Sequence, residues 1–190
     1  MVDIVLGVAV FVLAAAVIGL FAMMGELASR VINPDEQVPE HPPHPLEGAR
    51  LGAEPAEWPA ELAALRDADV AHLLVFGSTC TTCGQIASGA TGSLDILPQP
   101  LAVVVSSPLP ADGAEFIAKH PLLTRYPHMV DAGGTWVRSN FGVDGSPSVL
   151  VFTRGRLRSA HTYTTASALG RLSTSDSAEA KQARAAKSVR

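Results

Sequence analysis

The sequence predicts an α/β domain whose central strands are parallel and are covered by helices on both faces. Residues 73–76 and 101–105 are apolar runs of strand length, and each is followed by a segment with the composition of a helix. A strand–helix–strand–helix order implies parallel pairing, because each helix carries the chain back to the edge where the next strand begins. Residues 101–105 are apolar without alternation, as expected for a strand buried on both faces.

The second half of the chain predicts strands that complete a mixed sheet. Residues 128–131 are expected to form a short edge strand. Residues 148–152 and 156–163 flank the turn Arg154-Gly155, and the alternating second run favours an antiparallel pair. Helices are expected at residues 58–65, at 85–93 as a short or frayed continuation of the helix after the cysteines, at 114–119 with Asp112 as cap, at 136–141 and at 166–172. The strand side chains expected to be buried are Val75, Phe76, Val103, Val104, Val149 and Val151.

Residues 1–30 predict a transmembrane anchor. The run from Ile4 to Met24 carries no charge, and as a helix it would span about 30 Å, the thickness of the hydrocarbon core of a bilayer. A cleaved signal peptide is the alternative, but no Lys or Arg precedes the run. Arg30 is the only nearby cation and lies C-terminal to the run, which on charge alone favours a cytoplasmic domain.

Two further segments flank the predicted domain at residues 60–172. Residues 31–59 are rich in proline, and such a segment cannot hold a helix and tends toward extended geometry. We therefore expect a semi-rigid tether that holds the domain away from the bilayer. Residues 173–190 predict a flexible basic tail.

The composition excludes several classes of function. The net charge is −4 and no basic segment with interleaved aromatic residues is present, so nucleic acid is not an expected partner. Two cysteines are too few for a disulfide scaffold. A closed zinc site needs four ligands and no second cysteine pair exists, so no metal and no cofactor are assigned.

The two cysteines form the motif Cys80-Thr81-Thr82-Cys83, which follows a predicted buried strand and begins a helix. A Cys-x-x-Cys in this position indicates a redox pair. The unpaired N–H groups and positive dipole at a helix N-terminus stabilise a thiolate on the first cysteine. One helical turn brings the second cysteine close enough for the pair to cycle between dithiol and disulfide. Two buried, unreactive cysteines and a copper site completed by a histidine remain alternatives.

The Cys80–Cys83 motif and the later segment Val143-Asp144-Gly145-Ser146-Pro147-Ser148, which enters a strand-turn-strand, together resemble the thioredoxin fold. With the predicted anchor, the chain resembles membrane-tethered thiol–disulfide oxidoreductases of the TlpA and MauD type, over residues 71–172. Members of that group assist the maturation of extracytoplasmic cytochromes or amine dehydrogenases. The resemblance implies a thioredoxin-like domain with helices on both faces of a mixed sheet.

The resemblance also implies roles for particular residues. Cys80 would be the attacking cysteine, Cys83 the resolving cysteine, and Pro147 the cis-proline that faces them, although a trans proline at a strand entry is the alternative. Ser146 would offer its backbone to a substrate segment in strand-like fashion, and Thr79 would also contact substrate. Thr79 stands where thioredoxins usually have Trp, and the Thr81-Thr82 pair lacks the usual proline, so the redox potential does not transfer.

The function that the sequence favours is therefore thiol–disulfide exchange with protein substrates, catalysed at the cell membrane by a single-pass protein. The resemblance places the domain outside the cytoplasm, against the weak charge signal from Arg30. The alternatives are a copper carrier that uses the same cysteine pair and a redox-inert accessory subunit of a membrane complex.

Overall fold

The structure is a computed structural model that describes residues 13, 17 and 42–172. The chain divides into two compact units, Met1–Pro39 and Glu40–Arg190. Leu13 and Val17 are helical, while the rest of the predicted anchor and the predicted tail at 173–190 lie outside the described residues. Among the residues described, no helix combines the length and the apolar composition needed to cross a bilayer.

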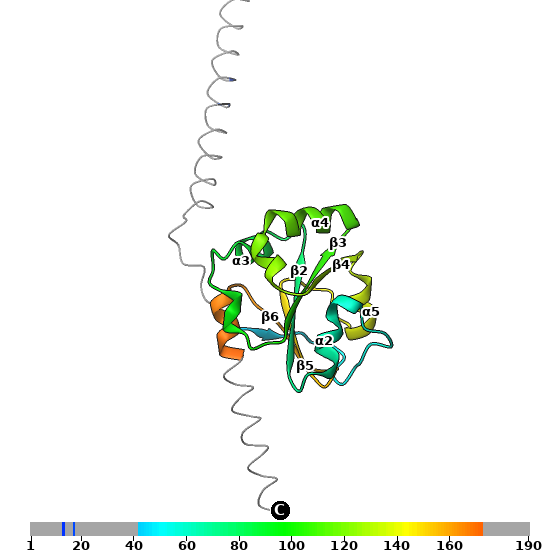
Figure 1. Ribbon diagram of the computed structural model, residues 1–190. Coiled ribbons are helices and arrows are strands. Elements are labelled where there is room, and N and C mark those ends of the chain that lie inside the picture. The colour runs from blue at the N-terminus through cyan, green and yellow to red at the C-terminus, as the bar shows by residue number, and fades with distance from the viewer. Residues whose placement is uncertain (1–12, 14–16, 18–41, 173–190) are drawn as a thin grey trace, which may run out of the picture. The chain divides into compact units, whose positions relative to one another are not determined.

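Six strands form one mixed sheet in the order β1-β6-β5-β2-β3-β4 (Figure 1). β2 pairs in parallel with β3, and β3 pairs in parallel with β4, so the predicted parallel centre is confirmed. β5 is antiparallel to β6, as expected for the turn at Arg154-Gly155, and it also pairs antiparallel with β2. The strands are β1 (His44–Pro45), β2 (Ala71–Gly77), β3 (Leu101–Ser107), β4 (His128–Ala132), β5 (Ser148–Thr153) and β6 (Arg156–Thr162).

Helices cover both faces of the sheet, because neighbouring residues of a strand point to opposite faces. Phe76 of β2 belongs to a core cluster with side chains of α3 and α4, whereas its neighbour Val75 belongs to a second cluster with side chains of η1, α2 and α5. The helices are η1 (Ala60–Leu62), α2 (Ala63–Asp67), α3 (Thr81–Ala87), η2 (Leu94–Ile96), α4 (Pro110–Lys119), η3 (Pro121–Arg125) and α5 (Thr135–Phe141). Residues 166–172 are also helical.

Six strand side chains that the sequence predicts to be buried are buried: Val75, Phe76, Val103, Val104, Val149 and Val151. The predicted cap of α4 is wrong, since the helix begins at Pro110 and Asp112 lies within its first turn. Proline suits the first position of a helix because its φ is already helical and its missing N–H is not needed there. α3 ends at Ala87, in agreement with the short or frayed helix expected there, and the chain then turns through Gly89 with φ +80°.

Part of the predicted tether is instead part of the folded domain. β1 extends the sheet beside β6, and the Arg50 N–H donates to the Phe141 carbonyl at 2.8 Å. The ring of Trp58 packs edge-on against Phe152 with 5.4 Å between centroids. A proline-rich composition argues against a helix but not against an edge strand or a loop packed on the sheet. The domain therefore begins N-terminal to residue 60.

Candidate functional site

Cys80 lies at the N-cap of α3, directly after the turn that ends β2, and is partly exposed. Its backbone is extended, with φ −86° and ψ 114°. The Cys80 N–H donates to the Gly77 carbonyl at 3.1 Å, which closes the turn. The Cys83 N–H donates to the Cys80 Sγ at 3.2 Å. The sulfur thus occupies the place of a capping side-chain oxygen, where otherwise unpaired N–H groups favour negative charge.

Cys83 lies one helical turn further on and is fully buried. The Gly77 N–H donates to its Sγ at 3.3 Å. Burial, followed by hydrogen bonding with Cys80, raises the pKa of Cys83 to about 12, against the opposing effect of the Gly77 N–H. Both cysteines are free, and they are unequal: one sulfur is reachable from solvent and the other is shielded as a neutral thiol.

The loop that leads into β5 lies beside this pair. The Ser146–Pro147 peptide bond is cis, in agreement with the prediction, and the Cys80 Sγ lies 3.8 Å from the Ser146 carbonyl oxygen as a hydrogen-bond donor. The Tyr163 N–H and the Thr162 hydroxyl donate to the Pro147 carbonyl at 3.4 Å and 3.1 Å. β6 therefore fixes a loop in which Pro147 is buried and Ser146 is exposed.

Gly77 is the point where β2, the proline loop and the start of α3 meet. A Cβ at Gly77 would lie 2.6 Å from Ser146 Oγ and 3.3 Å from Cys80 Cβ. A side chain here would require the exposed Ser146 hydroxyl to rotate away and Cys80 to shift by a few tenths of an ångström, so glycine permits the present close approach of the loop to Cys80. The sequence shows Gly77 only as the break after an apolar run. Nothing local indicates that Ser146 lies against it.

An open hollow of about 250 Å³ lies next to the same loop. Gly77 and Ser146 line it together with residues from the end of β3 and from the segment around α5, and its charged lining residues are Arg138 and Asp144. Exposed Thr79 immediately precedes Cys80. Thr79 and Ser146 are therefore exposed neighbours of Cys80, and Ser146 also borders the hollow.

The described residues provide no group of three His, Cys, Asp or Glu side chains that could hold a metal ion. His72 is buried in β2, and its Nδ1 is 3.2 Å from the Pro98 carbonyl oxygen. His120 packs against Phe116 with 4.5 Å between centroids. Burial lowers the pKa of His120, with Lys119 acting in the same direction. The third ligand that a copper site would need is therefore not assembled in this part of the chain.

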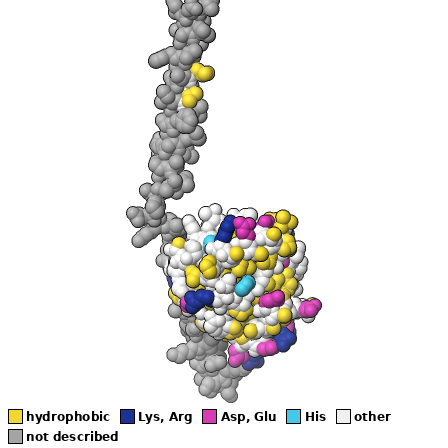
Figure 2. Space-filling view, turned by 45° about the horizontal axis from the view of Figure 1, so that its top comes forward, with side chains coloured by type: hydrophobic (Ala, Val, Ile, Leu, Met, Phe, Trp, Pro, Cys, Tyr) yellow, Lys and Arg dark blue, Asp and Glu magenta, His cyan; other side chains and the backbone are white. Residues whose placement is uncertain are grey.

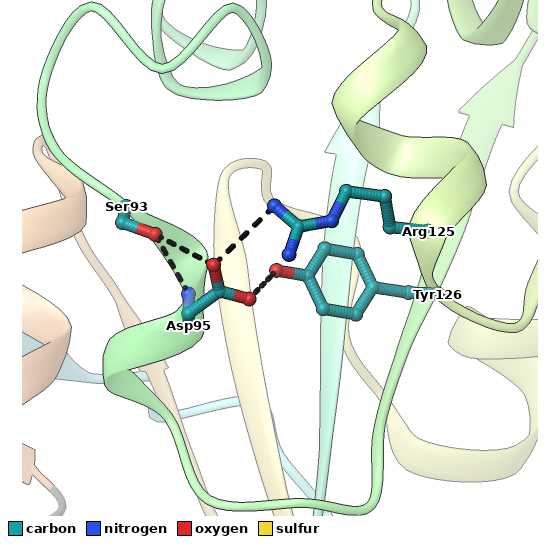
Figure 3. A network of polar contacts seen from close by, with 4 residues as sticks. All are labelled: Ser93, Asp95, Arg125 and Tyr126. Atoms are coloured by element: carbon teal, nitrogen blue, oxygen red, sulfur yellow. Dashed lines mark hydrogen bonds and ion pairs between the residues drawn. The ribbon is translucent and has the colours of Figure 1, made fainter.

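A polar network braces the chain beyond α3 (Figure 3). The Tyr126 hydroxyl donates to Asp95 Oδ1 at 2.6 Å, while Arg125 pairs with Asp95 at 3.4 Å and Ser93 donates to the same carboxylate at 3.1 Å. Hydrogen bonds from Tyr126 and Ser93 lower the pKa of Asp95. Burial and the bond to Asp95 raise the pKa of Tyr126 to about 12. The network joins η2 to the end of η3.

The face of the molecule in Figure 2 carries basic side chains that lie apart from one another, with acidic side chains near them. Apolar side chains are spread between these charged groups. On this face the basic groups therefore do not gather into one surface of the kind that binds a phosphate backbone.

Comparison with known proteins gives similarity only at the level of structure. No protein-family profile and no curated protein matches the chain. The solved structure of MTB dsbF in mixed oxidised and reduced forms is 21% identical, with a TM-score of 0.45 over 60% of this chain and 84% of that one.

Two further solved structures are similar. A secreted Mycobacterium tuberculosis disulfide oxidoreductase homologous to E. coli DsbE is 17% identical, with a TM-score of 0.43 over 59% of this chain and 85% of that one. StoA from Bacillus subtilis is 14% identical, with a TM-score of 0.41 over 66% and 96%. The sheet order, with helices packed on both faces, defines a mixed α/β fold.

Proposed function

We propose that this chain is a thiol–disulfide oxidoreductase that exchanges a disulfide or dithiol between Cys80–Cys83 and protein substrates. The observation that supports this proposal is the unequal placement of the two sulfurs. Cys80 is partly exposed at a helix N-cap beside the Ser146 carbonyl, and Cys83 is buried one turn away. An accessible first sulfur and a shielded second sulfur are what a two-step exchange requires.

The exchange consists of two displacements at sulfur. The Cys80 thiolate attacks a substrate disulfide, so that one Cys80–substrate bond forms, the substrate S–S bond breaks and one substrate thiolate leaves. Cys83 then loses its proton and attacks the Cys80 sulfur, which releases the second substrate thiolate. The products are a substrate dithiol, after the released thiolates are protonated, and the Cys80–Cys83 disulfide. The reverse sequence oxidises a substrate dithiol.

Ser146 and Thr79 are proposed to contact the substrate. Both are exposed next to Cys80, and Pro147 contributes no N–H that would compete for an incoming strand. A substrate segment that pairs with the Ser146 backbone would carry its own sulfur toward Cys80. The hollow beside Ser146 would accept a neighbouring substrate side chain.

The proposal extends to location: residues 1–30 anchor the protein in the cell membrane as a single span, and the domain acts outside the cytoplasm in the maturation of respiratory or redox proteins. The apolar run before Glu26 supports the anchor. We expect a reporter that is active only outside the cytoplasm to be active when fused after Arg190. If only a reporter that works in the cytoplasm is active at the same position, the domain lies in the cytoplasm instead.

The test of the exchange itself is Cys83→Ser. Without the resolving sulfur, Cys80 is expected to remain in a mixed disulfide with a cellular protein, visible on a non-reducing gel and removed by reductant. Mass spectrometry should locate the cross-link at Cys80.

Cys80→Ser is the matched control, because it keeps one cysteine but leaves only the buried one. We expect no mixed disulfide from this variant. If neither variant accumulates one, or if both accumulate equal amounts, the assignment of Cys80 as the attacking residue is overturned.

A further inference from the structure

Tyr163, the residue after β6, lies in the same buried core cluster as Cys83. Its side chain is 2% exposed and belongs to the same buried cluster as Cys83, against which Cys80 is packed. Its N–H donates to the Pro147 carbonyl at 3.4 Å. One residue is therefore tied through its backbone to the proline loop while its ring shares the core with both cysteines.

The Tyr163 hydroxyl is buried and has no hydrogen-bond partner among the described residues. A buried tyrosine hydroxyl normally has a partner, because leaving this group without one costs free energy. The other tyrosine in the chain, Tyr126, follows this rule through its bond to Asp95. The Tyr163 hydroxyl is therefore available to donate a hydrogen bond to a group that becomes a stronger acceptor during the reaction.

The two thiols are the titratable groups that act on Tyr163. Burial, followed by the negative charges of Cys83 and Cys80 when they are ionised, raises the pKa of Tyr163 well above its usual value. The phenol therefore keeps its proton while either cysteine is a thiolate. In that state it can only donate a hydrogen bond to sulfur, never compete with it as a second anion.

We propose that Tyr163 is a positioning residue for the resolving step, in which its hydroxyl donates a hydrogen bond to the Cys83 thiolate. This inference rests on the proposed function. In the mixed disulfide, Cys83 gives its proton to the substrate thiolate released earlier, directly or through water, and Tyr163 keeps its own. The Cys83 sulfur then bonds to Cys80, and the Cys80–substrate bond breaks.

Cys83 needs this donor more than Cys80 does. Cys80 is partly exposed and already accepts the Cys83 N–H. Cys83 is fully buried, and the groups that lower its pKa are the Gly77 N–H and the Ser146 hydroxyl. A thiolate formed there has lost its water, so each remaining donor has a large effect on how readily it forms.

Tyr163→Phe tests the inference, because it removes only the hydroxyl. The full-length protein is mixed with 5,5′-dithiobis(2-nitrobenzoate). Attack by Cys80 releases one coloured thionitrobenzoate, and resolution by Cys83 releases a second. We expect the first release to be unchanged in Tyr163→Phe. The second should slow about tenfold or more and need a higher pH, because a hydrogen bond to a charged group is lost.

Tyr126→Phe is the matched control and should leave both releases unchanged. If the second release, or its pH dependence, is the same in Tyr163→Phe and wild type, or if both releases slow equally, the inference is overturned. It is also overturned if Tyr163→Phe lowers the melting temperature more than Tyr126→Phe does, since the hydroxyl would then have a structural partner. If the wild-type protein shows no second release, the proposed function fails instead.

Discussion

Gly77→Ala is expected to lower the free energy of unfolding by about 1–3 kcal/mol, the usual cost of forcing an extra methyl group into packed surroundings. The new Cβ would lie 2.6 Å from Ser146 Oγ and 3.3 Å from Cys80 Cβ, so the Ser146 side chain must rotate away and Cys80 must shift slightly. Exchange should slow about tenfold to a hundredfold, because small displacements at a reacting centre have effects of that size. Denaturant unfolding and the rate of disulfide reduction measure the two effects.

A second substitution separates the clash from other effects of alanine. Ser146→Gly removes the side chain that the new methyl group meets, so it should restore much of the lost stability in the Gly77→Ala background. Gly145→Ala is the matched control, because its Cβ would meet nothing closer than Leu46 Cδ2 at 3.9 Å. Equal losses from Gly145→Ala and Gly77→Ala would contradict the role given to this close approach.

Trp58→Ala is expected to lower the free energy of unfolding by about 3 kcal/mol, at the lower end of the range for truncating a packed tryptophan because this side chain is only partly buried. The Trp58 ring lies 5.4 Å from Phe152 and 6.0 Å from Trp136, both edge-on. Its removal would leave a cavity between the N-terminal segment and the face of the sheet near α5. Urea unfolding of the two proteins under the same conditions measures the difference.

Leu51→Ala is the matched control from the same segment, since Leu51 is 65% exposed. Its effect should stay within about 0.5 kcal/mol, as is usual for surface positions. If Trp58→Ala were equally mild, residues 42–59 would contribute little to the stability of the fold. The prediction that this segment is a tether outside the domain would then be supported.

Several features could be predicted from the sequence because they depend on neighbouring residues. The continuous apolar runs in β2 and β3 require strands buried on both faces, and the connecting helices require these strands to be parallel. Once a helix begins after Cys80, the spacing of three residues places Cys83 about one helical turn away. Each of these inferences needs only the period of a strand or a helix and the steric properties of its residues.

The start of α4 is a local feature that the sequence leaves ambiguous. Asp112 and Pro110 are both suitable near a helix N-terminus, and the structure begins the helix at Pro110. Similarly, the proline content of residues 42–59 is compatible with a free tether and with a segment packed on the sheet edge. In the structure these residues pack on the domain through β1 and Trp58.

By itself, the sequence determined the parallel centre of the sheet, the burial of its strands and the position of the cysteine pair at a helix start. Only the tertiary structure decided that Ser146 meets Cys80 across 66 residues of chain, that a Cβ at Gly77 would meet Ser146 Oγ, and that Tyr163 shares a core cluster with Cys83. These contacts join segments far apart in sequence. They follow from how the sheet, the helices and the loops pack together, because no local periodicity or propensity specifies which distant residues come into contact.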